Sequence, residues 1–173
     1  MNILFLCISI WFSNIFSSYH IHPKNPLPKN IILMIGDGMG LSQISATMYA
    51  NGGTLHLEKA QHIGLIKTNS ASSIITDSAA GATAFSTGQK TYNGSINMSI
   101  DSLPLRPITQ TLYNKKIKSG IVATSSVTHA TPACFYGNQI NRYHVNEDLA
   151  KQFLQSNINV LIGGGENYFN NRS

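Results

Sequence analysis

Four short stretches rich in apolar residues stand out along the chain. The clearest lies in "NIILMIGDGMG", where five apolar residues stop at a glycine-rich turn. An apolar run without polar alternation is typical of a strand that is buried on both faces, as in a parallel sheet. The pattern predicts strands over residues 31–35, 62–68, 119–126 and 159–165.

The segments between these stretches favour helices. Asn146, for example, is a suitable N-cap, and Glu147 and Asp148 follow it in the first turn. Strands that alternate with helices predict an α/β fold with a layered, mostly parallel sheet. In such sheets, functional residues gather just beyond the carboxyl ends of the strands. The predicted helices cover residues 41–50, 79–87, 107–118, 132–142 and 146–156.

The first twenty residues differ from the rest of the chain. Ile3 to Phe12 form an apolar run that is too short to span a bilayer but suits the apolar region of a secretory signal. We therefore expect a signal peptide over residues 1–18, a proline-punctuated linker over 19–29 and one domain over 30–173. A cleaved signal implies a secreted or periplasmic protein. The alternatives are an uncleaved anchor or a buried segment.

The composition is that of a globular protein, with 42% hydrophobic residues and 14 glycines among 173 residues. The net charge of +5 does not indicate a nucleic-acid partner, because the basic residues are scattered and the densest cluster is the short "NKKIK". No membrane contact is expected beyond the leader. If the leader is cleaved, Cys7 leaves with it and Cys134 has no partner for an internal disulfide.

Asp37 is the first candidate for chemistry, because it follows the first predicted strand within "GDGMG". Alone, the three glycines resemble a turn that cradles phosphate. A bare carboxylate there would repel phosphate, since like charges about 4 Å apart cost about 4 kcal/mol at an effective dielectric of 20. A metal ion bound to Asp37 would remove this conflict. The alternative is a glycine turn whose aspartate caps the next helix.

The stretch "TDSAAGATAFSTGQKTYNG" holds the second candidate, Asp77 and Ser78 at the start of a helix built from small residues. Backbone N–H groups at a helix start attract anions. Ser78 would stand there as an oxygen nucleophile, which needs a base or a metal ion for activation near neutral pH. The alternative is that Asp77 or Ser78 serves only as an N-cap.

A third group follows the third predicted strand, in "SSVTHATPACFYGNQINR". His129 and Thr131 are two residues apart, so in extended geometry they would face the same way. Arg142 would lie about 15 Å along the helix that Pro132 opens. A guanidinium is suited to gripping two phosphate oxygens at once. The alternatives are a hydrogen-bonded loop histidine and a solvated arginine.

These motifs, together with "NVLIGGGENYF" and in this order, closely resemble the alkaline phosphatases over residues 30–169. The resemblance implies a layered α/β/α sandwich with a mostly parallel sheet. It also implies hydrolysis of phosphate monoesters with two zinc ions and one magnesium ion. Family members are commonly dimers, which makes a homodimer possible here.

Carried over residue by residue, the resemblance implies that Ser78 is the nucleophile that becomes phosphorylated and that one zinc ion activates it. Asp37 would be a carboxylate shared between a zinc ion and the magnesium ion, and Thr131 a magnesium ligand. Arg142 would hold the phosphoryl oxygens, and Asp77 would orient it. His129 occupies a position where family members carry Asp or His, and it would act on the magnesium site through water.

The remaining zinc ligands of the family have no counterpart in this sequence. We therefore expect a chain that is incomplete at its C-terminus, an N-terminal fragment with little or no activity alone. Two other functions remain open. One is a related metal-dependent phosphodiesterase or sulfatase, and the other is a non-catalytic remnant that binds phosphate or metal.

Overall fold

The computed structural model describes residues 28–170, and these divide into two units between Ile35 and Gly36. The expected signal peptide and all but the last two residues of the expected linker lie outside the described residues. Within the described part of the chain, no helix is both long and apolar enough to cross a membrane.

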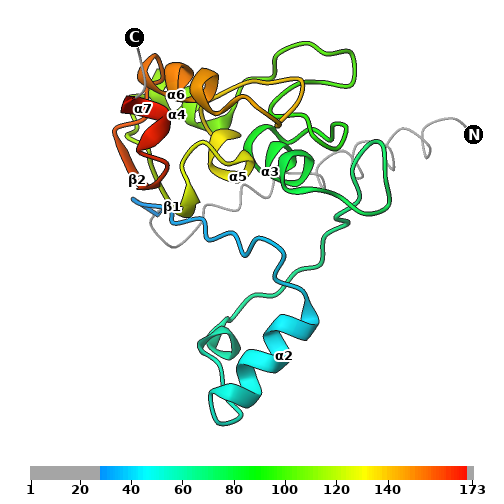
Figure 1. Ribbon diagram of the computed structural model, residues 1–173. Helices are drawn as coiled ribbons and strands as arrows, with labels where there is room; N and C mark the ends of the chain where they lie inside the picture. Colours follow the sequence, from blue (N-terminus) through cyan, green and yellow to red (C-terminus); the bar gives the residue numbers. More distant parts are fainter. Residues whose placement is uncertain (1–27, 171–173) are drawn as a thin grey trace, which may run out of the picture. The chain divides into compact units, whose positions relative to one another are not determined.

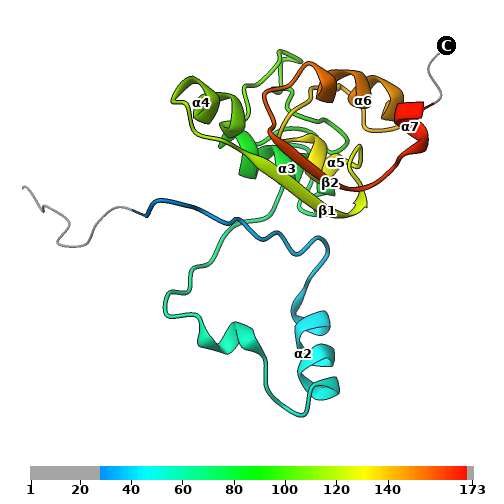
Figure 2. The ribbon, with the colours of Figure 1, turned by 90° about the vertical axis from the view of Figure 1, so that its left-hand side faces the viewer.

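The sheet consists of β1 (Gly120–Ser126) and β2 (Val160–Gly164), which pair in parallel (Figure 1). Figure 2 shows the two strands side by side. Ile121 pairs with Leu161 in the regular part of the ladder, and the register becomes irregular toward Ser126. These strands are two of the four that the sequence predicts. Their parallel pairing and the helices around them confirm the α/β class.

Helices make up most of the remaining regular structure, among them α5 (Ala130–Ala133) and α6 (Asn146–Leu154). The first turn of α6 corrects one prediction, because Val145 is the N-cap and Asn146 is already helical. The Asn146 side chain instead accepts a hydrogen bond from the Thr128 hydroxyl at 2.8 Å. Two of the helices, α5 and α6, lie in the connection between β1 and β2 and so form a strand–helix–strand crossover. The helical elements are α2 (Leu41–Ala50), the 3₁₀ helix η1 (His56–Lys59), α3 (Ser78–Thr87), α4 (Ile108–Asn114), α5 (Ala130–Ala133), α6 (Asn146–Leu154) and α7 (Asn167–Asn170).

The two predicted strands over residues 31–35 and 62–68 do not form, because neither segment pairs with a strand within the described residues. The first has no regular secondary structure. At the end of the second, the Lys90 ammonium binds the carbonyl oxygen of Lys67 and that of Asn69, just beyond the predicted strand. An apolar pattern reports a preference for burial, but a strand also requires a partner.

Two predicted helices are shorter in the structure. The helix predicted over 132–142 ends at Ala133, so Arg142 does not lie on it. The chain leaves the helical path because Gln139 forms an antiparallel bridge with Ile96. The helix predicted over 107–118 ends at Asn114, because Lys116 takes a left-handed conformation with φ of 60°.

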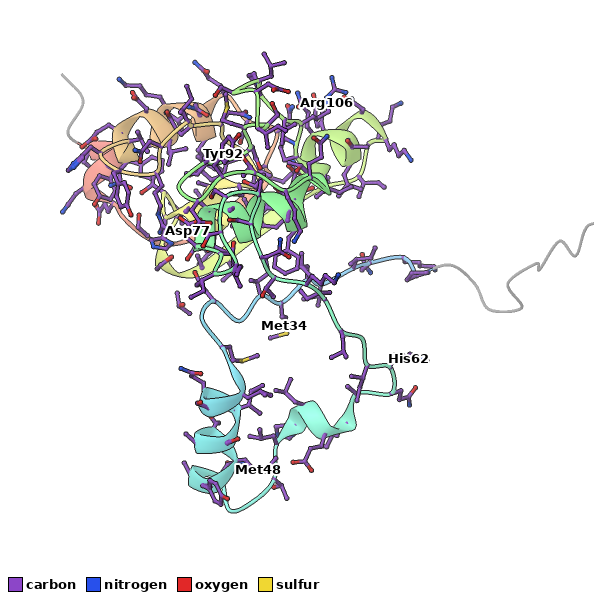
Figure 3. All side chains as sticks on the ribbon, turned by 90° about the vertical axis from the view of Figure 1, so that its right-hand side faces the viewer. Met34, Met48, His62, Asp77, Tyr92 and Arg106 are labelled. Atoms are coloured by element: carbon purple, nitrogen blue, oxygen red, sulfur yellow. The ribbon has the colours of Figure 1, made fainter. Side chains whose placement is uncertain are left out.

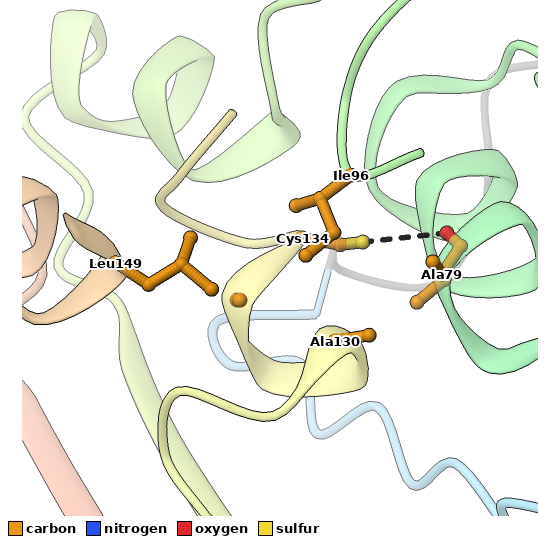
Figure 4. Packing of buried hydrophobic residues seen from close by; sticks show 7 residues of the cluster. Ala79, Ile96, Ala130, Cys134 and Leu149 are labelled. Carbon is orange, nitrogen blue, oxygen red and sulfur yellow. Dashed lines mark hydrogen bonds between the residues drawn. The ribbon is translucent and has the colours of Figure 1, made fainter. Parts of the chain in front are cut away.

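The core is built around α3 and α5, which meet through alanines. Ala79 and Ala133 are completely buried, as is Cys134 directly after α5. Figure 4 shows the Cys134 thiol donating to the carbonyl oxygen of Ala79, at 3.4 Å between sulfur and oxygen. Ile96 and Leu149 supply the larger buried side chains of the same cluster. Small side chains therefore allow the two helices to approach closely.

Asn97 connects these helices through polar contacts inside the core. It is fully buried and adopts a left-handed conformation with φ of 46°. Its amide group donates to the carbonyl oxygens of Cys134 and Gly137, and its side-chain oxygen accepts from the Ser86 hydroxyl at 2.8 Å. Both N–H groups and the oxygen of the buried amide thus have partners. The contacts link the end of α3 to the segment that follows α5.

Leu149 offers a test of this core. Replacing Leu149 with alanine leaves a cavity, and we expect the free energy of unfolding to fall by about 2–5 kcal/mol. Urea unfolding followed by circular dichroism measures the change. Leu154→Ala on the same helix is the control, because Leu154 is 63% exposed, and its effect should stay within about 0.5 kcal/mol. Equal effects of the two substitutions would contradict this core.

Candidate functional site

The start of α3 positions the nucleophile candidate. Asp77 is the N-cap, and its Oδ1 accepts a hydrogen bond from the Ala80 backbone N–H at 2.9 Å. Ser78 is the first residue of the helix (Figure 3 labels the adjacent Asp77). At the other end, Gly88 closes the helix with φ of 75°, a conformation that glycine adopts without steric cost. The helix is therefore defined at both ends by local chemistry.

The Asp77 carboxylate gathers three segments of the chain. Besides capping α3 through Oδ1, it accepts the Gly94 backbone N–H at 3.0 Å and an Arg142 N–H at 3.2 Å, both at Oδ2. The Arg142 and Asp77 side chains are 16% and 25% exposed. The ion pair is thus partly shielded from water, and it holds the guanidinium next to the start of α3.

A second carboxylate, that of Asp37, collects two hydroxyl groups. Asp37 lies in the turn between Gly36 and Gly38, and Gly38 has φ of 67°. Its Oδ1 accepts the Ser78 hydroxyl at 3.1 Å, and its Oδ2 accepts the Thr131 hydroxyl at 2.8 Å. The structure thus brings together Asp37, Ser78 and Thr131, which are far apart in the sequence.

The expectation that His129 and Thr131 face the same way from an extended strand is wrong. The chain turns at His129, which is the N-cap of α5, and Thr131 already belongs to that helix. Thr131 contacts Asp37, whereas the His129 ring lies 3.0 Å from an Arg142 nitrogen, measured from Nε2 to NH2. Since a guanidinium can only donate, Nε2 is the acceptor in this contact.

Arg142 reaches the site from a loop rather than from a helix. Its backbone N–H donates to the Gly94 carbonyl oxygen at 2.8 Å, so Gly94 contacts Arg142 through its carbonyl and Asp77 through its N–H. The neighbouring Asn93 side chain accepts from the Asp77 N–H at 3.2 Å and donates to the Ile75 carbonyl at 2.9 Å.

Sequence reasoning assigned no role to Asn93 or Gly94. The available signal was the Asn-Gly pair at the end of "TDSAAGATAFSTGQKTYNG", since this pair favours tight turns. That signal predicts a turn without naming its partners, which lie up to 48 residues away at Arg142. The turn at Asn93 and Gly94 is therefore an addition to the predicted site.

The donor atoms around Asp37 are all oxygens. A carboxylate and two hydroxyls that converge in this way suit a hard cation such as Mg²⁺, which prefers oxygen ligands. Zinc sites take nitrogen, sulfur or carboxylate ligands, usually with three or four from the protein. Within residues 28–170 there is no cluster of three or more His, Cys, Asp or Glu side chains placed to hold a metal ion.

Comparison with known proteins decides the family. The family described as "Alkaline phosphatase" matches residues 28–173, well over half of the chain. The chain belongs to the alkaline phosphatase family. The alkaline phosphatase of Schizosaccharomyces pombe is 39% identical over 163 residues, which cover 87% of this chain and 30% of that relative. Alkaline phosphatase 4 of Bacillus subtilis is 34% identical over 159 residues, with coverages of 83% and 34%.

A solved alkaline phosphatase has the same fold. The enzyme from the Antarctic bacterium TAB5 aligns with a TM-score of 0.75 and 49% identity, over 79% of this chain and 40% of that one. This likeness confirms the fold class that the motifs imply. The chain spans about a third of the length of the curated alkaline phosphatases named above.

Cys134 lies beneath the site, where its sulfur is 3.4 Å from both the Thr83 hydroxyl and the Ala79 carbonyl oxygen. Burial raises the pKa of the thiol from its ordinary 9.0 to about 12. Burial also raises the pKa of the nearby Tyr136 phenol, and a second cause is the proximity of Cys134. The Tyr136 hydroxyl donates to the Val127 carbonyl at 2.9 Å. Both groups are therefore neutral parts of the core near neutral pH.

Substitutions at Asp77 separate its two structural roles. Asp77→Ala removes the helix cap and the ion pair, and we expect a loss of about 2 kcal/mol or more in the free energy of unfolding. Asp77→Asn keeps the capping oxygen but replaces Oδ2 with an N–H₂ group that cannot accept from Gly94 or Arg142, so we expect it to restore only the part of the loss that belongs to the cap, about 1 kcal/mol. Urea unfolding measures both losses. Asp101→Ala, at an exposed turn residue, is the control. If Asp77→Ala were as stable as Asp101→Ala, the role of Asp77 as helix cap and ion-pair partner would be refuted.

The buried thiol predicts a pH dependence. Above pH 9 the unfolded thiol ionises while the folded thiol keeps its proton, so the stability that Cys134 contributes is lost between about pH 9 and 12. In a Cys7→Ser background, which leaves Cys134 as the only thiol, iodoacetamide should label the native protein far more slowly than the urea-unfolded protein. Mass spectrometry measures both rates. Equal rates would show that the thiol is accessible in the native state.

Proposed function

We propose that this chain supplies part of the active site of a phosphate monoester hydrolase that works through a phosphoserine at Ser78. The observation that carries the proposal is that two carboxylates with different partners lie at the start of α3. Asp37 contacts the Ser78 hydroxyl, and Asp77 holds Arg142 at the start of the same helix. Membership of the alkaline phosphatase family supports this reaction class.

In the proposed reaction, Ser78 Oγ attacks phosphorus and the ester oxygen leaves with a proton as an alcohol. Water then cleaves the phosphoserine and releases inorganic phosphate. The start of α3 offers N–H groups and a favourable dipole to the phosphoryl oxygens. Arg142 adds a fixed positive charge, and a guanidinium has five N–H donors, of which the contacts of the described residues use only two. Both features stabilise negative charge as it shifts in the transition state.

The oxygen cluster around Asp37 fits a divalent cation. In this proposal Asp37 and Thr131 would hold magnesium, and Asp37 with Ser78 would hold one of two zinc ions whose other ligands lie outside the described residues. Bound cations there would favour the ionised form of the serine hydroxyl. The chain's own part is to keep the Ser78 oxygen 3.1 Å from the Asp37 carboxylate, at the start of α3.

A relative supports the assignment of His129 to the magnesium site. A variant of the TAB5 alkaline phosphatase with a histidine replaced by aspartate is described with Mg bound in its M3 site. That structure aligns with this chain at 47% identity and a TM-score of 0.75. In this chain we infer that His129 is the histidine that borders such a site. Its contact with Arg142 would then couple the cation to the phosphate-binding group.

The finer expectations from the sequence remain part of this proposal. They are the leader over residues 1–18 with secretion or a periplasmic location, a homodimer, and low activity of this chain alone. The competing functions are a related phosphodiesterase or sulfatase and a non-catalytic remnant. We favour the monoester reaction because Asp77 holds Arg142 at the start of α3, where its guanidinium can bind the phosphoryl oxygens.

The test follows the covalent intermediate. We would join residues 28–170 of this chain to the remainder of the TAB5 enzyme, supply zinc and magnesium, and add an aryl phosphate monoester. The expected results are release of the phenol and a phosphoryl group on Ser78 in acid-quenched samples by mass spectrometry. Ser78→Ala should remove both signals, with turnover reduced by about 10³-fold or more.

Controls separate the possible failures. Ser45→Ala changes an exposed serine on α2 and should leave turnover unaltered. Full turnover by Ser78→Ala, or a phosphoryl group on another residue, would refute the nucleophile assignment. Faster cleavage of a diester than of the monoester would favour the phosphodiesterase instead. The unfused chain in the same assay tests whether it is active alone.

A further inference from the structure

The chain contains two Asn-Gly sequences, Asn51-Gly52 and Asn93-Gly94. In such a pair, the glycine nitrogen can attack the asparagine side-chain carbonyl because glycine has no side chain to hinder the approach. Both asparagines are exposed in the structure. Exposure therefore does not distinguish the two pairs, whereas the hydrogen bonds of each pair and its place in the fold do.

Asn51 is the C-cap of α2, three residues after Met48, which Figure 3 labels, and its backbone N–H donates to the Thr47 carbonyl at 2.9 Å. Its side-chain amide nitrogen donates to the Thr54 carbonyl at 2.7 Å. The attacking atom, the Gly52 nitrogen, makes only a long hydrogen bond of 3.3 Å to the Tyr49 carbonyl. Gly52 has φ of 72° and Gly94 has φ of 90°, and nothing lies within 4 Å of the position of a Cβ at either glycine, so the space beside the glycine is the same at the two sites. Helix ends also fray readily.

Asn93 is held from both sides. Its side-chain oxygen accepts from the Asp77 N–H and its amide nitrogen donates to the Ile75 carbonyl. The attacking atom, the Gly94 nitrogen, donates to the Asp77 carboxylate at 3.0 Å, and the Gly94 carbonyl accepts from the Arg142 N–H at 2.8 Å. Ring closure requires rotation of this peptide, so several of these bonds must break together.

We propose that Asn51 is a site of spontaneous deamidation in the folded protein. The hydrogen bonds of the turn at Asn93 and Gly94 protect Asn93 from the same reaction. The Gly52 nitrogen forms a bond to Cγ of Asn51 and gives up its proton, and the side-chain amide leaves as ammonia. Water then opens the cyclic imide at either carbonyl, which yields aspartate or isoaspartate.

The product changes the electrostatics of α2. Each event replaces a neutral amide with a carboxylate next to the last turn of the helix, where the helix dipole is already negative. The isoaspartate form also inserts an additional carbon into the backbone at the helix cap. Deamidation at Asn51 therefore weakens the end of α2, whereas the same reaction at Asn93 would place a second negative charge beside Asp77.

The deamidation rates of Asn51 and Asn93 can be compared in a single sample. The purified chain is incubated at mildly alkaline pH with and without urea, and peptide mass spectrometry follows both asparagines over time. Without urea, we expect Asn93 to react about a hundredfold more slowly than Asn51, because several hydrogen bonds must open first. In urea the two rates should converge. Equal rates without urea, or Asn51 reacting only in urea, would overturn the proposal.

Two variants test the cause. Gly52→Ala should slow the reaction at Asn51 at least tenfold because its methyl group hinders the attacking nitrogen, and it should leave Asn93 unchanged. Alanine is strained at φ of 72° and so loosens the end of α2, which means that slower reaction in this variant cannot come from tighter hydrogen bonds. Asp77→Ala frees the Gly94 nitrogen and should speed the reaction at Asn93 without affecting Asn51. If Asn93 were equally protected in Asp77→Ala, its hydrogen bonds would not be the reason for the protection.

Discussion

The carboxylate of Asp77 is the contact on which the arrangement of the site depends. It caps α3, accepts the Gly94 N–H and pairs with Arg142, so one partly shielded side chain connects three segments that are distant in sequence. A carboxylate in such a place requires several donors, because desolvation of a charge is costly unless it is compensated. One of these donors, Arg142, is also the group that we propose to bind the phosphoryl oxygens. The hydrogen bonds that stabilise the Asp77 carboxylate therefore also hold Arg142 in place.

Asp37 is the opposite case. It takes part in none of the ion pairs among residues 28–170, and it is bound only by the hydroxyls of Ser78 and Thr131. A carboxylate neutralised by arginine is suited to positioning, and one that lacks a cationic partner is suited to holding a metal ion. The two acids beside Ser78 therefore differ in electrostatic role although their chemistry is identical. This division supports the assignment of metal binding to Asp37 and of arginine orientation to Asp77.

The sequence predicts those parts of the structure that are decided locally. It predicts α2 over residues 41–50 and the start of α3 to within one residue, because small residues and a capping aspartate act within a few positions. It also supplies the residues that meet around Ser78. What it misses depends on distant partners: the carbonyls of residues 67 and 69 bind Lys90 rather than a strand, and the loop of Arg142 is held by Gly94. No local pattern encodes these pairings, because each depends on where another segment lies.

The alanine contact between α3 and α5 also limits how this site can vary. Ala79 and Ala133 have no accessible surface, and the close approach of their helices leaves space for little more than a methyl group. A bulkier residue would push apart the two helices that carry Ser78 and Thr131. Substitutions at these positions are therefore limited by side-chain volume rather than by polarity. The distance between Ser78 and Thr131 therefore depends on two alanines that take no part in the proposed reaction.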